Sequence, residues 1–78
     1  MKVLLRDEQA RLYHGPNDTW VADPAAATDY QMVERAGREA FQRPALMLTV
    51  VLRYESPECE LALNPAFCIH RTQTSHVH

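Results

Sequence analysis

The segment Ala45–Tyr54 (ALMLTVVLRY) decides the fold, because it is a long apolar run without glycine, proline or acidic residues. Side chains alternate across a β-strand, so one face of this segment would be apolar throughout, with Leu46, Leu48, Val50, Leu52 and Tyr54. The other face would be half apolar, with Met47, Thr49, Val51 and Arg53. β-Branched residues in the segment favour a strand over a buried helix. We therefore predict a central strand that has a helix against its apolar face.

Three shorter segments precede this strand and predict an antiparallel meander. Lys2–Arg6 and Arg11–His14 alternate in the manner of strands, and Thr19–Ala22 resumes the pattern after Gly15–Asp18. The sequence Gly-Pro-Asn-Asp is typical of a tight turn, because glycine and asparagine tolerate positive φ and proline fixes its own. These three segments would pair as a sheet joined by short loops.

A helix is predicted from about Met32 to Gln42. Apolar or small residues recur there at spacings of three and four, as on one face of a helix, at Met32, Val33, Ala36, Gly37, Ala40 and Phe41. Asp29 could cap an earlier start, and Pro44 ends the helix because the residue before a proline avoids the α region. The order of elements is then βββαβ, which is an α+β fold with an antiparallel sheet.

The C-terminal third allows two interpretations. Cys59–Leu63 and Phe67–His70 could form a hairpin around residues 64–66, or only the first of these arms joins the sheet. Residues 71–78 are polar and without period, which predicts a disordered tail. One small domain is expected over residues 1–70.

Composition excludes several classes of function. Ten acidic residues stand against eight basic ones in a chain of 78 residues, and no basic block predicts a nucleic-acid interface. The apolar N-terminus is too short for a signal peptide or a membrane span. We expect a cytoplasmic protein that has reduced thiols, no cofactor and no nucleic-acid or membrane partner.

Cysteine and histidine gather near the C-terminus and raise the question of a metal site. The weak candidates are Cys59, Cys68 and His70, but their spacing matches no paired Cys-x-x-Cys or His-x-x-x-His motif. A Cys59–Cys68 disulfide is incompatible with the hairpin, which would hold the two Cα atoms further apart than the roughly 7 Å that a bridge allows. A metal- or thiol-responsive protein is therefore the alternative function.

Support for catalysis is slight. His14 beside its turn could pair with Asp18 or Asp23, but no nucleophile motif and no glycine-rich phosphate loop accompanies it. We therefore predict that the protein is not an enzyme. The aromatic side chains are assigned to the core, with an alternative in which Tyr13 and Trp20 form a binding patch on the open sheet face. The assigned set is Tyr13, Trp20, Tyr30, Phe41 and Tyr54.

Several of these segments together resemble a group of short uncharacterised bacterial proteins. The shared features are a Leu-Tyr-x-x-Gly…Trp segment at Leu12–Trp20, an Ala-x-Asp-Tyr step at Ala27–Tyr30, a helix, and then an apolar strand. The resemblance spans residues 2 to about 54 and consists of packing motifs. It implies a common fold and carries no activity.

The half-apolar face of the central strand predicts an interface. Its residues Met47, Thr49, Val51 and Arg53 would contact a second copy of the chain or a protein partner, because a core this small gains from such a contact. The sequence thus predicts a non-enzymatic interaction or regulatory module that forms a homodimer.

Overall fold

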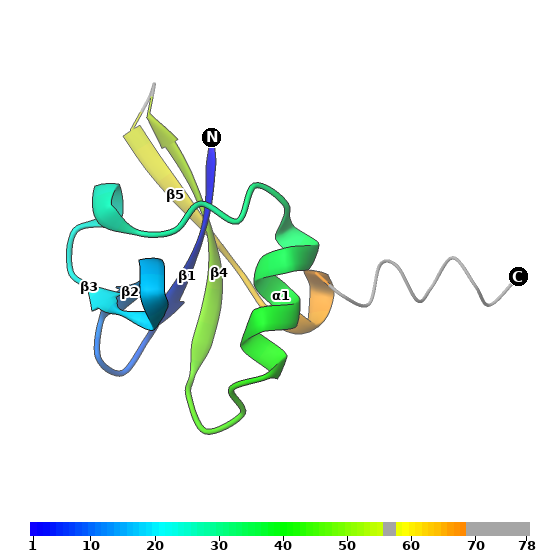
Figure 1. Ribbon diagram of the computed structural model, residues 1–78. Coiled ribbons are helices and arrows are strands. Elements are labelled where there is room, and N and C mark those ends of the chain that lie inside the picture. The colour runs from blue at the N-terminus through cyan, green and yellow to red at the C-terminus, as the bar shows by residue number, and fades with distance from the viewer. Residues whose placement is uncertain (56–57, 69–78) are drawn as a thin grey trace, which may run out of the picture.

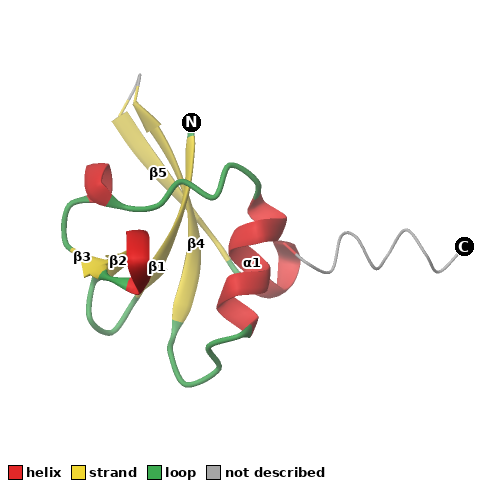
Figure 2. Ribbon diagram, viewed as in Figure 1, coloured by secondary structure: helices red, strands yellow, loops and turns green. Residues whose placement is uncertain are grey.

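Five antiparallel strands form one sheet in the spatial order β3-β2-β1-β4-β5. The computed structural model describes residues 1–55 and 58–68. The strands are β1 (Lys2–Asp7), β2 (Leu12–His14), β3 (Trp20–Val21), β4 (Leu48–Glu55) and β5 (Glu58–Leu63). One helix, α1 (Val33–Phe41), lies across one face of the sheet (Figures 1 and 2). The predicted α+β class with an antiparallel sheet is therefore confirmed. The sheet has five strands, and the fifth, β5, is the C-terminal strand that the sequence had left open.

Strand β4 carries the alternation that the apolar segment predicted. Leu48 and Val50 lie in the core beneath the helix, together with Val3 and Leu5 of β1, whereas Val51 lies on the opposite face. The strand begins at Leu48 and not at residue 45, because the chain is still turning after Pro44 and the Leu46 amide donates to the carbonyl of Arg43.

The N-terminal meander is present, but its third strand has only two residues. Asp7 Oδ1 accepts from the Gln9 amide at 3.0 Å and closes the β1–β2 turn. Between β2 and β3 the chain forms a short 3₁₀ turn, η1 (Pro16–Asp18), in which Asn17 and Asp18 have φ of 57° and 59°. Gly15 itself has an extended φ of −115°, so the expected use of its backbone freedom is wrong. Its small size matters instead, because a Cβ atom would lie 2.9 Å from the Thr19 hydroxyl.

Helix α1 covers β1 and β4 with the face that the sequence predicted. Ala36, Gly37 and Ala40 are its buried residues, and their small size lets the helix approach the sheet closely. Phe41 was assigned to the core and is 56% exposed, because it ends the helix beyond the sheet. Asp29 does not cap the helix. Its carboxylate accepts from the amides of Val3 and Gln31 and so attaches the preceding loop to β1.

The C-terminal third follows the second of the two interpretations. β5 pairs with β4 in six consecutive steps from Val50–Leu63 to Glu55–Glu58. Residues 65–68 then form a helical turn instead of a returning strand, and this turn places Cys68 in the core. The predicted hairpin around residues 64–66 is thus wrong. The predicted tail, residues 71–78, lies outside the described residues.

The sheet face opposite the helix has a small core of its own. Leu4, Tyr13 and Val51 are buried there, and Val21 and Ala27 pack against them. Ala27 follows the 3₁₀ turn η2 (Pro24–Ala26), which crosses this region before the chain reaches the helix. Tyr13 therefore packs on this face, whereas Trp20 and Tyr30 pack on the helix side. Tyr54, also assigned to the core, is 36% exposed.

Candidate functional site

A chain of polar contacts joins the meander to the end of the helix. His14 of β2 is buried, and its Nδ1 is hydrogen-bonded to the Tyr30 hydroxyl. Its Nε2 lies 2.8 Å from Asp18 Oδ1. The same carboxylate oxygen is 2.7 Å from Arg43 Nη2, and Arg43 Nε donates to Glu39 at 2.9 Å. Of the two partners that the sequence allowed for His14, Asp18 is the one that the structure places beside it. Asp23 is elsewhere, capping η2 through the Ala25 amide.

Three groups of this cluster, Asp18, Tyr30 and Arg43, have a shifted pKa. The hydrogen bond from His14, aided by the charge of Arg43, lowers the pKa of Asp18. Burial raises the pKa of Tyr30 to about 12, and the negative charge of Glu39 acts in the same direction. The hydrogen bond to Glu39 raises the pKa of Arg43. Asp18 is therefore a carboxylate and Tyr30 a neutral phenol throughout the physiological range.

Both imidazole nitrogens of His14 are engaged by protein groups. With one nitrogen on Tyr30 and the other on Asp18, the ring connects β2 to the loop and the turn. Arg43 extends that connection to α1. We call this connected group of side chains the His14 clamp (Tyr30, His14, Asp18, Arg43 and Glu39).

The cysteine and histidine candidates are not brought together within the described residues. Cys59 is exposed on β5, whereas Cys68 is 2% exposed in the helix-side core, and no disulfide joins them there. His70 lies outside the described part. Within residues 1–55 and 58–68, no group of three or more metal-ligating side chains is found. The predicted metal- or thiol-responsive role remains a prediction without a described site.

Glu60 of β5 is the hub of an ion-pair network on the face opposite the helix. Its carboxylate accepts from Arg53 at 2.8 Å, from Arg6 at 3.1 Å and from the Tyr13 hydroxyl at 3.0 Å. Arg6 also donates to Glu8 at 2.7 Å. Long side chains from four strands thus cover the small core beneath them, and the carboxylate of Glu60 is neutralised by its own chain.

This network predicts a loss of stability in acid. Burial alone would raise the pKa of Glu60, but hydrogen bonds from Tyr13 and Arg53 and the charge of Arg6 outweigh it and lower that pKa. A carboxyl whose pKa is lowered by folding stabilises the fold above its unfolded pKa and loses that effect as the pH falls through its folded pKa. We expect Glu60→Gln to cost about 1–2 kcal/mol at pH 7. Thermal melts should show this difference narrowing from about pH 4.5 downward.

Glu55→Gln is the matched control for that measurement. Glu55 lies 3.8 Å from Lys2 with a side chain that is 74% exposed, and exposed pairs contribute little. Its variant should follow the wild-type melting temperature across the same pH range. A constant difference between Glu60→Gln and the wild type at every pH would contradict the assigned role of the carboxylate.

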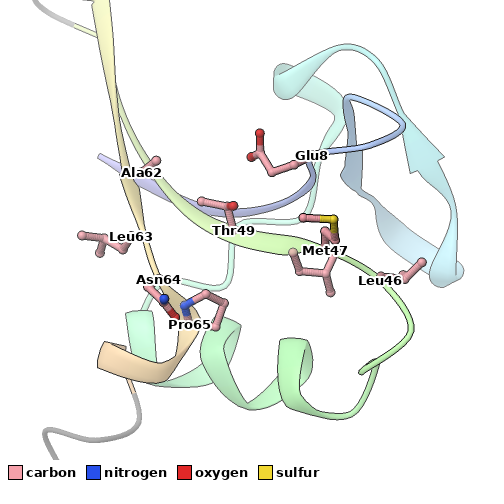
Figure 3. Close-up of a pocket in the computed structure, with 9 residues that line it drawn as sticks. Glu8, Leu46, Met47, Thr49, Ala62, Leu63, Asn64 and Pro65 are labelled. Carbon is pink, nitrogen blue, oxygen red and sulfur yellow. The ribbon is translucent and has the colours of Figure 1, made fainter.

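A groove of about 470 Å³ lies where β4 begins and β5 ends (Figure 3). Its walls come from the β1–β2 turn, the start of β4 and the end of β5. The lining residues are Glu8, Leu46, Met47, Leu48, Thr49, Ala62, Leu63, Asn64 and Pro65. The lining of the groove is polar and apolar in nearly equal parts, with the carboxylate of Glu8 at one side of it.

The structure places the four residues of the predicted interface in different environments. Met47 is 59% exposed and lines the groove with Thr49. Val51 is fully buried by residues of its own chain, so it is not available to a partner. Arg53 is engaged by Glu60. The predicted contact through the β4 face thus keeps only Met47 and Thr49 as accessible members, and it remains a prediction.

The outer edge of β5 is the surface that the sequence analysis did not identify. β5 pairs with β4 on one side, and within the described residues no strand pairs with its other side. Leu61 is 51% exposed and Cys59 is exposed. The signal was present as alternation in Glu58–Leu63, but only the sheet order shows that this strand lies at an edge.

The fold and this edge define a small antiparallel α+β domain with an open side. No protein-family model, curated protein or solved structure matches the chain. No described helix is both long and apolar enough to cross a membrane.

Proposed function

We propose that this protein is a non-enzymatic interaction module that self-associates through its sheet. The observation that carries the proposal is the outer edge of β5, which no strand covers within the described residues. Natural sheets guard exposed edges with charged side chains, especially lysine, or with proline, bulges or very short strands, because unpaired N–H and C=O groups invite pairing with another chain. β5 has six residues, contains no lysine or proline, and follows β4 in an uninterrupted register. Of its glutamates, Glu60 is bound by donors of its own chain.

The opposite edge of the sheet shows the contrast. β3 has only two residues, and proline-containing 3₁₀ turns lie on either side of it. This edge strand is too short to form a ladder of backbone hydrogen bonds with a strand of another chain. In the part of the chain that the structure describes, the sheet therefore has one open edge and one blocked edge, as expected of a chain that dimerises through a single edge.

The non-enzymatic part of the proposal rests on the sequence, in which no nucleophile motif and no glycine-rich phosphate loop accompanies His14. In the structure the His14 clamp links the meander to the end of the helix.

Sedimentation equilibrium at micromolar concentration tests this proposal directly. We expect a mass twice that of one chain, falling toward the single-chain mass on dilution. The self-association should survive high salt, because backbone hydrogen bonds and apolar contacts are screened much less than surface ion pairs. A single-chain mass at every concentration would refute self-association.

A further inference from the structure

We propose that two copies of the chain pair antiparallel through β5, with Leu61 on the two-fold axis. This inference rests on the proposed self-association and deepens it by naming the surface and the register. The two sheets would join edge to edge into one continuous ten-stranded sheet. A strand that pairs antiparallel with its own copy is self-complementary, because each residue pair occurs twice about the axis.

The faces of the sheet restrict the possible registers. The two-fold axis is perpendicular to the sheet, so the helix side of one copy adjoins the helix side of the other. On β5 the helix side carries Cys59, Leu61 and Leu63, since these residues pair with Tyr54, Leu52 and Val50 of β4. Side chains directly opposite in an antiparallel pair share a face. The axis must therefore pass through a residue position, and not between two residues.

Charge then selects among the remaining positions. An axis at Glu60 and an axis at Leu61 both pair five residues of β5, whereas an axis at Ala62 pairs only three. The axis at Glu60 would set that carboxylate, together with the Arg6 and Arg53 side chains bound to it, against the same groups of the second copy, and like charges directly opposite destabilise a sheet. With the axis at Leu61, Glu60 lies opposite Ala62 of the partner subunit. The register centred on Leu61 is thus the longest one without opposed carboxylates.

The same register covers the exposed apolar residues of β5. Leu61, which is 51% exposed, would contact the partner's Leu61, and Cys59 would lie opposite the partner's Leu63. These contacts extend the helix-side core across the axis. Glu60 can remain bound to Arg6, Arg53 and Tyr13, because they lie on the other face of the sheet and within its own chain. Pairing therefore requires no rearrangement of the network.

The groove in Figure 3 adjoins this pairing at the end of β5. Leu63 contributes to one wall of the groove and would pair with the partner's Cys59. Asn64, the next residue of that wall, follows in the same register and would lie beside the partner's Glu58. The β5 wall of the groove is therefore continuous with the proposed interface.

Disulfide trapping tests the register. In a Cys59→Ser background, Leu61→Cys should give an intermolecular disulfide in high yield under mild oxidation, because paired Cα atoms of an antiparallel sheet lie about 4.5–5.5 Å apart. Cys68 does not compete, because it is 2% exposed. Ala62→Cys in the same background is the matched control. Its two copies would be offset by about 6.6 Å along the strand, which places them beyond the range of a bridge. Efficient trapping through Ala62→Cys in place of Leu61→Cys would overturn the register.

A charged residue at position 61, on the proposed two-fold axis, tests whether the edge of β5 is the dimer interface. Leu61→Lys would set two ammonium groups opposite each other at the two-fold, so we expect at least a tenfold weaker dimer with an unchanged far-UV circular dichroism spectrum. Phe41→Lys is the control, since Phe41 is similarly exposed but lies on α1, and it should leave the dimer intact. A dimer that survives Leu61→Lys, with no trapping at position 61, would overturn the β5 pairing and leave self-association standing. A single-chain mass for the wild type would overturn both.

Discussion

Val51→Asp is expected to unfold the domain. Val51 is fully buried against Leu4 and Tyr13. The donors that cover this small core, Arg6, Arg53 and the Tyr13 hydroxyl, are already bound to Glu60, so a carboxylate at position 51 would have to compete for them. Burying an unpaired charge costs several kcal/mol. A chain of this size has only about 4–12 kcal/mol of total stability, so the variant should lose the far-UV spectrum of the sheet and the dispersed amide resonances at 25 °C.

Met47→Asp is the matched control for this experiment. Met47 lies on the same side of the same apolar segment, but it is 59% exposed, so its variant should stay within about 0.5 kcal/mol of the wild type. The comparison separates two roles for Val51. A Val51→Asp protein that remains folded and has a single-chain mass would place Val51 at an interface, as the sequence predicted, and not in the core.

Leu5→Ala should lower the free energy of unfolding by about 2–5 kcal/mol. Leu5 is fully buried on the helix side of the sheet, where it packs in one cluster with Val50 and Ala36. The small residues of α1 allow the helix to lie close to the sheet, so the cavity left by the substitution has no flexible neighbour to fill it. Urea titration at a fixed protein concentration measures the change, with the midpoint shifting and the slope unchanged.

Leu52→Ala provides the comparison, because Leu52 is on the same face but is only partly buried. Its loss should be clearly smaller than that of Leu5→Ala. Equal losses at the two positions would show that the helix-side core is more loosely packed than the structure describes.

The face assignments were predictable because they depend on local periodicity. In a strand, neighbouring side chains point to opposite faces whatever the partner strand is. Leu48 and Val50 could therefore be placed beneath the helix, and Ala36 and Ala40 opposite them, before any contact was known. The turn at Asn17, which has a positive φ, and the end of the helix before Pro44 follow from backbone sterics of single residues, which are equally local.

The candidate site was less predictable, because it depends on contacts between distant segments. His14 and Asp18 are four residues apart and were paired correctly, but the partners Tyr30 and Arg43 join them only through the packing of the loop and helix. The role of Glu60 likewise depends on Tyr13, a residue 47 positions away in sequence. No sequence motif or residue spacing predicts these long-range contacts.

By itself the sequence determined that this chain is an α+β domain, which residues face its helix, and where its turns fall. The tertiary structure alone decided that Val51 is buried and that β5 is left at an open edge. The physical reason is that the alternation of side chains along a strand determines which face of the sheet a residue occupies. What covers that face depends on the order of the strands and on how far long side chains such as Tyr13 and Arg6 extend over it. For Ala45–Tyr54, its own chain covers the half-apolar face at Val51, and the surface left for a partner lies one strand further out.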